Sequence, residues 1–205
     1  MLSYRHAFHA GNFADVLKHS VLTLVLEYMT RKDKGFYYID SHSGAGMYQL
    51  ADEYAQKTGE YKDGIAKLIE NDDLHPTDIE HLKEYSQRWN KSHVKQSDGY
   101  QGVLGLVPPP NRRGVVLIDP PYELKEDYIK AVRTIVNAYK KFATGTYILW
   151  YPVVKRELVE QMQSAFTKSD VRNVLQVEYC QKTDTQEYGM TGTGLFIVNP
   201  PWQLT

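Results

Sequence analysis

The sequence has only one cysteine among its 205 residues and a net charge of only −1. A single cysteine, Cys180, excludes an internal disulfide and is typical of a reducing compartment, and its place in an apolar segment predicts a buried thiol. Because the whole molecule has almost no net charge, any contact with nucleic acid must come from a local patch of basic residues.

Long apolar runs and flexible linkers are also lacking. No run approaches the length of a membrane span, and the first residues lack the apolar core of a signal peptide. The sequence contains no internal repeat, low-complexity tract or Gly/Ser linker. We therefore expect a cytoplasmic protein without membrane contact, and the length predicts a single domain over residues 1–205.

The most informative stretch begins at Gly114, where Val-Val-Leu-Ile predicts a strand buried on both faces. Pro120 and the proline after it end this strand, because proline has no N–H to donate. Ligands of open α/β sheets bind beyond the carboxyl ends of the strands, so Asp119, the Pro120 carbonyl and Tyr122 are expected in a crevice. The carboxylate and the carbonyl can each accept one hydrogen of an exocyclic amine, and the tyrosine can stack on its ring. The alternative is a Pro-rich turn in which Asp119 caps a helix starting near Glu123.

A second acid, Asp40, ends a short aromatic and β-branched run and precedes a turn that contains His42, Gly44 and Gly46. Glycine lets a ligand approach the backbone, because no Cβ is in the way. The turn lacks the third glycine of the dinucleotide fingerprint and the lysine of a P-loop. Methyltransferases use such a turn to hold the methionine end of S-adenosylmethionine, and this turn fits that interpretation.

A third acid, Asp98, stands with Gly99 after a short strand predicted over residues 93–96. Its carboxylate can accept the N6 hydrogens of a cofactor adenine. It can equally cap a helix over residues 100–107, and both roles are compatible.

The remaining pattern predicts an α/β protein. Helices are expected over residues 13–28, 60–70, 77–89, 127–142 and 155–166, with Asn12 as the first N-cap, and later strands over 146–151, 173–180 and 194–198. The last two strands have no helix between them, so they pair antiparallel. The expectation is a Rossmann-like S-adenosylmethionine-dependent methyltransferase fold: a doubly wound sheet with an antiparallel terminal strand, and a small helical insertion over about residues 47–90. Asn199-Pro-Pro-Trp202 follows the reversed strand, so it is expected at the edge opposite Asp119.

Several basic residues are candidates for an RNA-binding patch. They are Arg5, Lys18, Arg31, Lys32, Lys34, Arg112 and Arg113. For Arg31, Lys32 and Lys34 a solvated surface charge is the favoured interpretation.

Blocks of sequence along nearly the whole chain carry a family resemblance. They are Met1-Leu-Ser-Tyr-Arg-His-x-Phe-His-Ala-Gly-Asn-x-Ala-Asp-Val-Leu-Lys-His19, Asp40-x-His42-x-Gly-Ala-Gly46-x-Tyr-Gln-Leu, Gly59-Glu-Tyr-x-x-Gly-Ile, Leu74-His-Pro, Ile118-Asp-Pro-Pro-Tyr-Glu123, Leu149-Trp-Tyr-Pro-Val-Val154, Gly189-Met-Thr and Asn199-Pro-Pro-Trp202. In these blocks the sequence resembles the bacterial 23S ribosomal RNA adenine-N6 methyltransferases of the RlmJ type. The Asp119 block is similar to the Asp-Pro-Pro-Tyr motif of amino methyltransferases in general.

The resemblance implies a site and a reaction. S-adenosylmethionine contacts are implied for His19, His42, Asp98, Gly99 and Asp119, an RNA contact for Tyr4, and catalysis at Asp119, with Pro120 and Tyr122 beside it. Its position in the helix alone predicts that His19 is a structural residue at the edge of the core. The implied activity is N6 methylation of an adenine in 23S ribosomal RNA free of ribosomal proteins, by a monomer and without a metal. The alternatives are a DNA adenine-N6 methyltransferase and a catalytically silent RNA-binding protein of the same fold.

The sequence departs from the family near Asp73 and Leu74. Parallel neighbouring strands need a crossover, yet no second strand is recognisable between Asp40 and residue 93. About 30 residues, roughly one βαβ unit, are expected to be missing there. Either residues of the protein are absent from the sequence at this point, which we favour, or the protein carries a genuine deletion. A Cα–Cα distance of about 3.8 Å across the junction is expected if the chain is continuous.

Overall fold

The computed structural model describes residues 9–43, 57, 59–65, 97–184 and 189–204. The chain groups into two compact units. The larger unit draws its described residues from 17–46 and 98–205, and the smaller one from 5–16 and 47–97. Each unit is described by itself.

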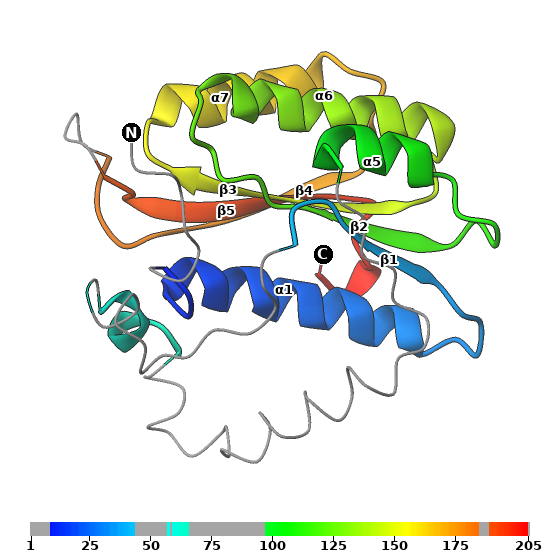
Figure 1. The fold of residues 1–205 in the computed structure, drawn as a ribbon, viewed down its shortest axis with the longest axis horizontal. Coiled ribbons are helices and arrows are strands. Elements are labelled where there is room, and N and C mark those ends of the chain that lie inside the picture. The colour runs from blue at the N-terminus through cyan, green and yellow to red at the C-terminus, as the bar shows by residue number, and fades with distance from the viewer. Residues whose placement is uncertain (1–8, 44–56, 58, 66–96, 185–188, 205) are drawn as a thin grey trace. The chain divides into compact units, whose positions relative to one another are not determined.

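A five-stranded sheet forms the centre of the larger unit, in the order β1-β2-β3-β5-β4 (Figure 1). The strands are β1 (Tyr37–Asp40), β2 (Gly114–Ile118), β3 (Thr146–Val153), β4 (Val174–Cys180) and β5 (Gly192–Val198). β1, β2 and β3 are parallel, whereas β5 is antiparallel to both of its neighbours, β3 and β4. The predicted Rossmann-like methyltransferase fold with a reversed final strand is thereby confirmed.

Helices cover both faces of this sheet (Figure 1). α5 (Gly99–Leu106), α6 (Glu126–Lys141) and α7 (Arg156–Thr167) lie on one face, and α1 (Phe13–Thr30) lies on the other. All five residues of β2 are buried because they alternate between the two layers: Val116 and Ile118 pack toward α5–α7, and Val115 and Leu117 toward α1. Among the described helices, none combines the length and apolar character needed to cross a bilayer.

The strands differ from the prediction mainly in the half of the sheet formed by β3, β5 and β4. β3 extends two residues further than predicted and β5 begins two residues earlier. The pairing of β3 with β5 is therefore longer than the sequence pattern predicts. The prediction that Cys180 is buried is wrong: it is exposed, because it lies at the end of β4, the last strand of the described sheet.

Other predictions fall on the insertion. The strand over residues 93–96, the helix over 77–89 and the junction at 73–74 lie outside the described residues. Of the helix predicted over 60–70, the described part is a 3-10 helix, η2 (Glu60–Asp63), that ends at Gly64.

The smaller unit joins two of the sequence blocks. Asn12 caps α1, since its Oδ1 accepts from the N–H groups of Ala14 and Asp15 at 3.0 Å, as predicted. Its Nδ2 donates to Glu60 at 2.9 Å, and Nδ1 of His9 lies 3.0 Å from both oxygens of the same carboxylate. The hydrogen bond that the His9 ring donates to the Glu60 carboxylate raises the pKa of His9. The Glu60 carboxylate therefore links the N-terminal block to the block around Gly59.

Candidate functional site

Asp119 follows the last residue of β2, at the edge of the sheet where the parallel strands end. Asp40 pairs in register with Leu117 of β2, and the N–H of Ser41 donates to the Leu117 carbonyl at 3.0 Å. The turn after Asp40 is therefore fixed beside Asp119. α6 begins only at Glu126, so the alternative in which Asp119 caps a helix near Glu123 is wrong.

Lys18 of α1 forms an ion pair with Asp119, with Nζ 2.6 Å from Oδ2. The Lys18 side chain is 5% exposed and that of Asp119 19%. A buried ammonium needs a counter-charge, and Asp119 supplies it. The interpretation of Lys18 as part of an RNA-binding surface patch is therefore wrong, and no local pattern indicated this pairing between residues 101 positions apart.

Tyr122 lies inside the site with its backbone in the left-handed region, at φ 51°. An aromatic residue rarely adopts this conformation, and such strain concentrates at functional sites. Its hydroxyl donates to the Trp150 carbonyl, and its ring centroid lies 4.5 Å from that of Tyr128 and 5.8 Å from that of Trp150. Burial raises the pKa of the Tyr122 hydroxyl, which keeps it protonated as a donor.

Trp150 of β3 is a site residue that the sequence did not single out. It is half-buried, whereas the other residues of β3 are buried. Nε1 donates to Thr193 Oγ1 at 2.7 Å, and Lys18 Nζ lies 5.5 Å from the ring centroid, within cation–π range. Trp150 therefore contacts both the residue that pairs with Asp119 and the tyrosine that follows it.

The predicted cofactor residues His42, Asp98 and Gly99 come together at the same edge. A Cβ added to Gly99 would overlap the carbonyl oxygen of Ser41 and lie 3.0 Å from His42 Nε2. Only glycine permits this approach between the start of α5 and the turn after β1. Asp98 caps α5 by accepting from the Gln101 N–H at 2.9 Å, a hydrogen bond that lowers the pKa of its carboxyl.

Several charges act on one another at this edge. Burial raises the pKa of Asp40, and the nearby negative charge of Asp119 raises it further. Burial lowers the pKa of His42, which feels the charges of Asp119 and Asp98 in the opposite direction. Asp119 is therefore close enough to act on both Asp40 and His42, and Asp98 acts on His42 as well.

Other predicted site residues are less informative. His19 is exposed on α1, one residue beyond the buried Lys18. Tyr4, Gly44 and Gly46 lie outside the described residues.

The second Pro-Pro motif lies at the opposite edge of the sheet, as predicted, because β5 runs antiparallel to β3. Asn199 is held there by its amide, whose Nδ2 donates to the carbonyls of Ala143 and Gly145 at 2.8 Å. Its own carbonyl accepts from Thr146 Oγ1 at 3.2 Å. This motif fastens the end of β5 to the turn before β3 and takes no part in the site around Asp119.

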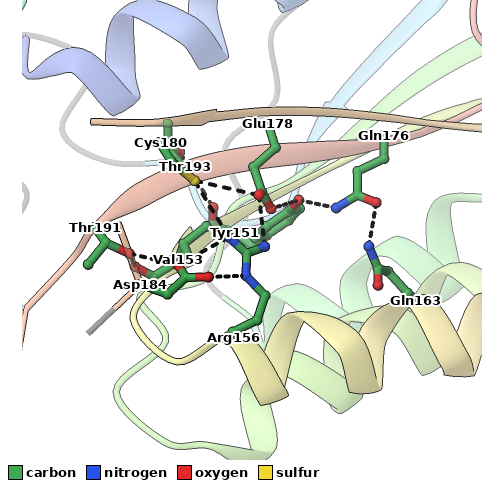
Figure 2. Close-up of polar contacts among 10 residues, drawn as sticks. All are labelled: Tyr151, Val153, Arg156, Gln163, Gln176, Glu178, Cys180, Asp184, Thr191 and Thr193. Atoms are coloured by element: carbon green, nitrogen blue, oxygen red, sulfur yellow. Dashed lines mark hydrogen bonds and ion pairs between the residues drawn. The ribbon is translucent and has the colours of Figure 1, made fainter. Parts of the chain in front are cut away.

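The β4–β5 hairpin is fastened at the edge of Asp119 (Figure 2). Arg156, at the start of α7, donates to Asp184 and to Glu178, each at 2.7 Å. Glu178 also accepts from the Tyr151 hydroxyl at 2.8 Å, and Thr191 Oγ1 donates to the Val153 carbonyl at 3.2 Å. The network holds the described part of the hairpin beside the end of β3.

A Rossmann-like sheet with a reversed last strand, three acids at one edge and an Asp-Pro-Pro-Tyr motif after its second described strand define a methyltransferase of the amino type. Comparison with known proteins agrees. A family model described as "Ribosomal RNA large subunit methyltransferase D, RlmJ" matches residues 33–75 and 71–205. The chain belongs to this family, which confirms both the resemblance and the prediction of an rRNA methyltransferase.

Similar proteins match over the full chain. Ribosomal RNA large subunit methyltransferase J of Escherichia coli is 40% identical over 249 residues, covering 100% of this chain and 89% of the relative. That of Haemophilus influenzae is 40% identical over 250 residues with the same coverage. A crystal structure of protein LPL1258 from Legionella pneumophila has a TM-score of 0.77 and 34% identity, covering 95% of this chain and 88% of that one.

The alignments also show a difference in length. The aligned region of the E. coli relative has 249 residues against 205 here, so the relative carries 44 residues without a counterpart in this chain. The family model matches in two pieces that meet at residues 71–75.

Proposed function

We propose that this protein transfers a methyl group from S-adenosylmethionine to N6 of an adenine in 23S ribosomal RNA. The observation that carries the proposal is the environment of Asp119, which lies at the end of β2 with Oδ2 paired to the buried Lys18 at 2.6 Å. The family names rRNA of the large subunit as the substrate, and the chemistry of this site favours an exocyclic amine.

His42, Asp98 and Gly99 would hold the cofactor. The close approach that requires glycine at position 99 brings the Asp98 carboxylate and the His42 ring to one edge, and carboxylate oxygens accept the N6 hydrogens of an adenine. Bound there, S-adenosylmethionine supplies an electrophilic methyl group. His19 and Asp119 are the further contacts that the resemblance implies.

Asp119 and the Pro120 carbonyl orient the target amine. Lys18 occupies Oδ2, which leaves Oδ1 of the same carboxylate to accept one N6 hydrogen while the Pro120 carbonyl accepts the other. With both hydrogens held, the nitrogen lone pair turns out of the ring system toward the methyl group. As the new N–C bond formed and the S–C bond of the methyl donor broke, N6 would gain positive charge, which the fixed negative charge of Asp119 would stabilise. The proton would then leave N6 to water. The main contribution is positioning of the two reacting atoms.

Tyr122 and Trp150 supply aromatic surface for a base drawn out of its stack. Stacking on one aromatic side chain contributes about 1–3 kcal/mol, which offsets an unstacking cost of a few kcal/mol. Tyr4 is proposed as a further RNA contact. The proposed substrate is RNA free of ribosomal proteins, and the enzyme is proposed to act as a cytoplasmic monomer.

The test is methyl transfer to 23S RNA fragments, to the same RNA in ribosomal particles and to duplex DNA, followed by nucleoside analysis. N6-methyladenosine in free RNA is expected. Methylated DNA without methylated RNA would identify the DNA methyltransferase instead. Failure to bind S-adenosylmethionine in a calorimetric titration, with RNA binding retained, would identify a silent RNA-binding protein. The Asp119→Ala variant should abolish transfer, and retained activity would refute the role of this carboxylate.

A further inference from the structure

A cavity lies at the edge of the sheet opposite Asp119, where β2 and β3 begin and β5 ends. Its volume is about 400 Å³, within the range of small-ligand sites of roughly 300–1,000 Å³. Its walls come from the end of α1, the turn before β2 and the Pro-Pro motif after β5, including Lys32, Arg112, Arg113, Asn199 and Trp202. None of the residues that line it is acidic.

Two of the three cations face solvent and one has a structural task. The Arg113 guanidinium donates to the carbonyls of Met29 and Lys34 and lies 5.6 Å from the Phe36 ring centroid, so it fastens the end of α1. Lys32 and Arg112 are exposed at the mouth of the cavity. Without an acid in the lining, the three positive charges act together, and an anionic ligand is favoured there.

Trp202 gives this cavity an aromatic surface. Its side chain is 70% exposed, which is unusual for the largest apolar residue. The chain that leads to it is held rigidly: Asn199 donates two hydrogen bonds to the turn before β3, and Pro201 accepts from the Leu204 N–H at 2.9 Å. An exposed indole on a fixed backbone beside cations suits a stacked nucleobase with its phosphates on Lys32 and Arg112.

We infer that this opposite-edge cavity is a second RNA-binding site, which takes a single-stranded nucleotide of the substrate while another part of the RNA occupies the site of Asp119. The inference rests on the proposed function for the identity of the nucleic acid. The two edges are separated by the length of β3, eight residues, or about 25 Å at 3.3 Å per residue. Only an RNA long enough to span this distance reaches both sites.

The test measures RNA binding by fluorescence anisotropy without any methyl donor, so failure of methyl transfer does not affect it. Two RNAs are compared: a trinucleotide, and a hairpin with an A-form stem of about ten base pairs, ~28 Å long. The variants are Trp202→Ala, Lys32→Gln and Arg112→Gln. Arg133→Gln, an exposed arginine of α6 on the other face of the sheet, is the matched control.

Trp202→Ala is expected to weaken hairpin binding about 5-fold or more, which corresponds to loss of one stacked base. Lys32→Gln and Arg112→Gln should each weaken it and reduce the slope of log K against log salt by about 0.7–0.9. The trinucleotide, which reaches only one site at a time, should bind the unmodified protein more weakly than the hairpin does. The melting temperature should stay unchanged in the two charge variants, and Arg133→Gln should alter neither binding nor melting temperature. The inference is overturned if hairpin binding and its salt slope are unchanged in all three variants, or if Arg133→Gln weakens hairpin binding as much as they do.

Discussion

The two edges of the sheet carry opposite charge, although the chain as a whole has a net charge of −1. At the edge where the parallel strands end, Asp40 is the last residue of β1 and Asp119 follows β2, and the negative charge of Asp119 adds to the burial that raises the pKa of Asp40. At the other edge, Lys32, Arg112 and Arg113 surround a cavity without an acid. The proposed amine site and the proposed second contact with an RNA backbone would use these opposite fields, which the near-zero total charge of the chain does not reveal.

Two lysines offer the sharpest comparison of the edges. Lys18→Met removes the ion-pair partner of Asp119 and leaves its carboxylate inside the site, so we expect a loss of about 3 kcal/mol in unfolding free energy and at least ~100-fold in methyl transfer. Lys32→Met, at the exposed opposite edge, should change the unfolding free energy by no more than about 0.5 kcal/mol. Urea unfolding and initial rates measure both.

A double variant separates stability from chemistry at Asp119. In Lys18→Met/Asp119→Leu both charges are gone, and replacing a buried pair by apolar groups is often neutral, so most of the stability should return. Activity should not return. Recovered activity in the double variant would show that the ion pair serves only the fold.

Gly99→Ala should mainly weaken cofactor binding. The added Cβ overlaps the Ser41 carbonyl, and relieving such overpacking typically costs 1–3 kcal/mol, so we expect S-adenosylmethionine affinity to fall about 10-fold in a calorimetric titration. Gly105→Ala in the same helix is the control, because a Cβ there meets no atom within 4 Å. It should leave affinity unchanged and raise stability by about 0.5–1 kcal/mol. Equal effects of the two substitutions would contradict the proposed close approach.

Arg156→Gln should loosen the β4–β5 hairpin without altering the opposite edge. The side chains of the ion pairs are 21–43% exposed, so a loss of only about 1 kcal/mol is expected. Hydrogen exchange should accelerate at the amides of Gln181 and Lys182, which donate to the Thr191 carbonyl. Unchanged exchange at these two amides would show that the backbone pairing holds the hairpin unaided.

The pH dependence of stability should carry a small contribution from His42. Burial lowers its pKa below the ordinary 6.5, so below pH 6.5 the unfolded chain takes up a proton that the folded protein does not. Stability is therefore lost as pH falls through this range, and His42→Gln should flatten the decline. His9, whose pKa is raised by Glu60, contributes with the opposite sign, so its substitution should steepen the decline. Urea titrations between pH 5 and 7.5 compare the three proteins, and parallel curves would contradict both assignments.

Most of the fold was predictable because its signals are local. Apolar runs marked β2 and β3, helical spacing marked α1 and α6, and Asn12 marked the start of α1. The reversed last strand followed from the absence of a helix between two strands. The exposure of Cys180 was not predictable, because an apolar segment does not reveal which strand lies at the border of the sheet.

The sequence by itself determined the class of protein and the place of its chemistry: the strand that ends at Asp119, the prolines that stop it and the blocks shared with a family of rRNA methyltransferases. Only the tertiary structure decided that Lys18 is the buried partner of that carboxylate, that Trp150 contacts both Lys18 and Tyr122, and that Lys32, Arg112 and Trp202 meet at one cavity. Helices, strands and the direction of the last strand can be predicted from residues that are close together in the sequence. Pairing between residues more than a hundred positions apart depends on how the helices pack on the sheet, which no local pattern specifies.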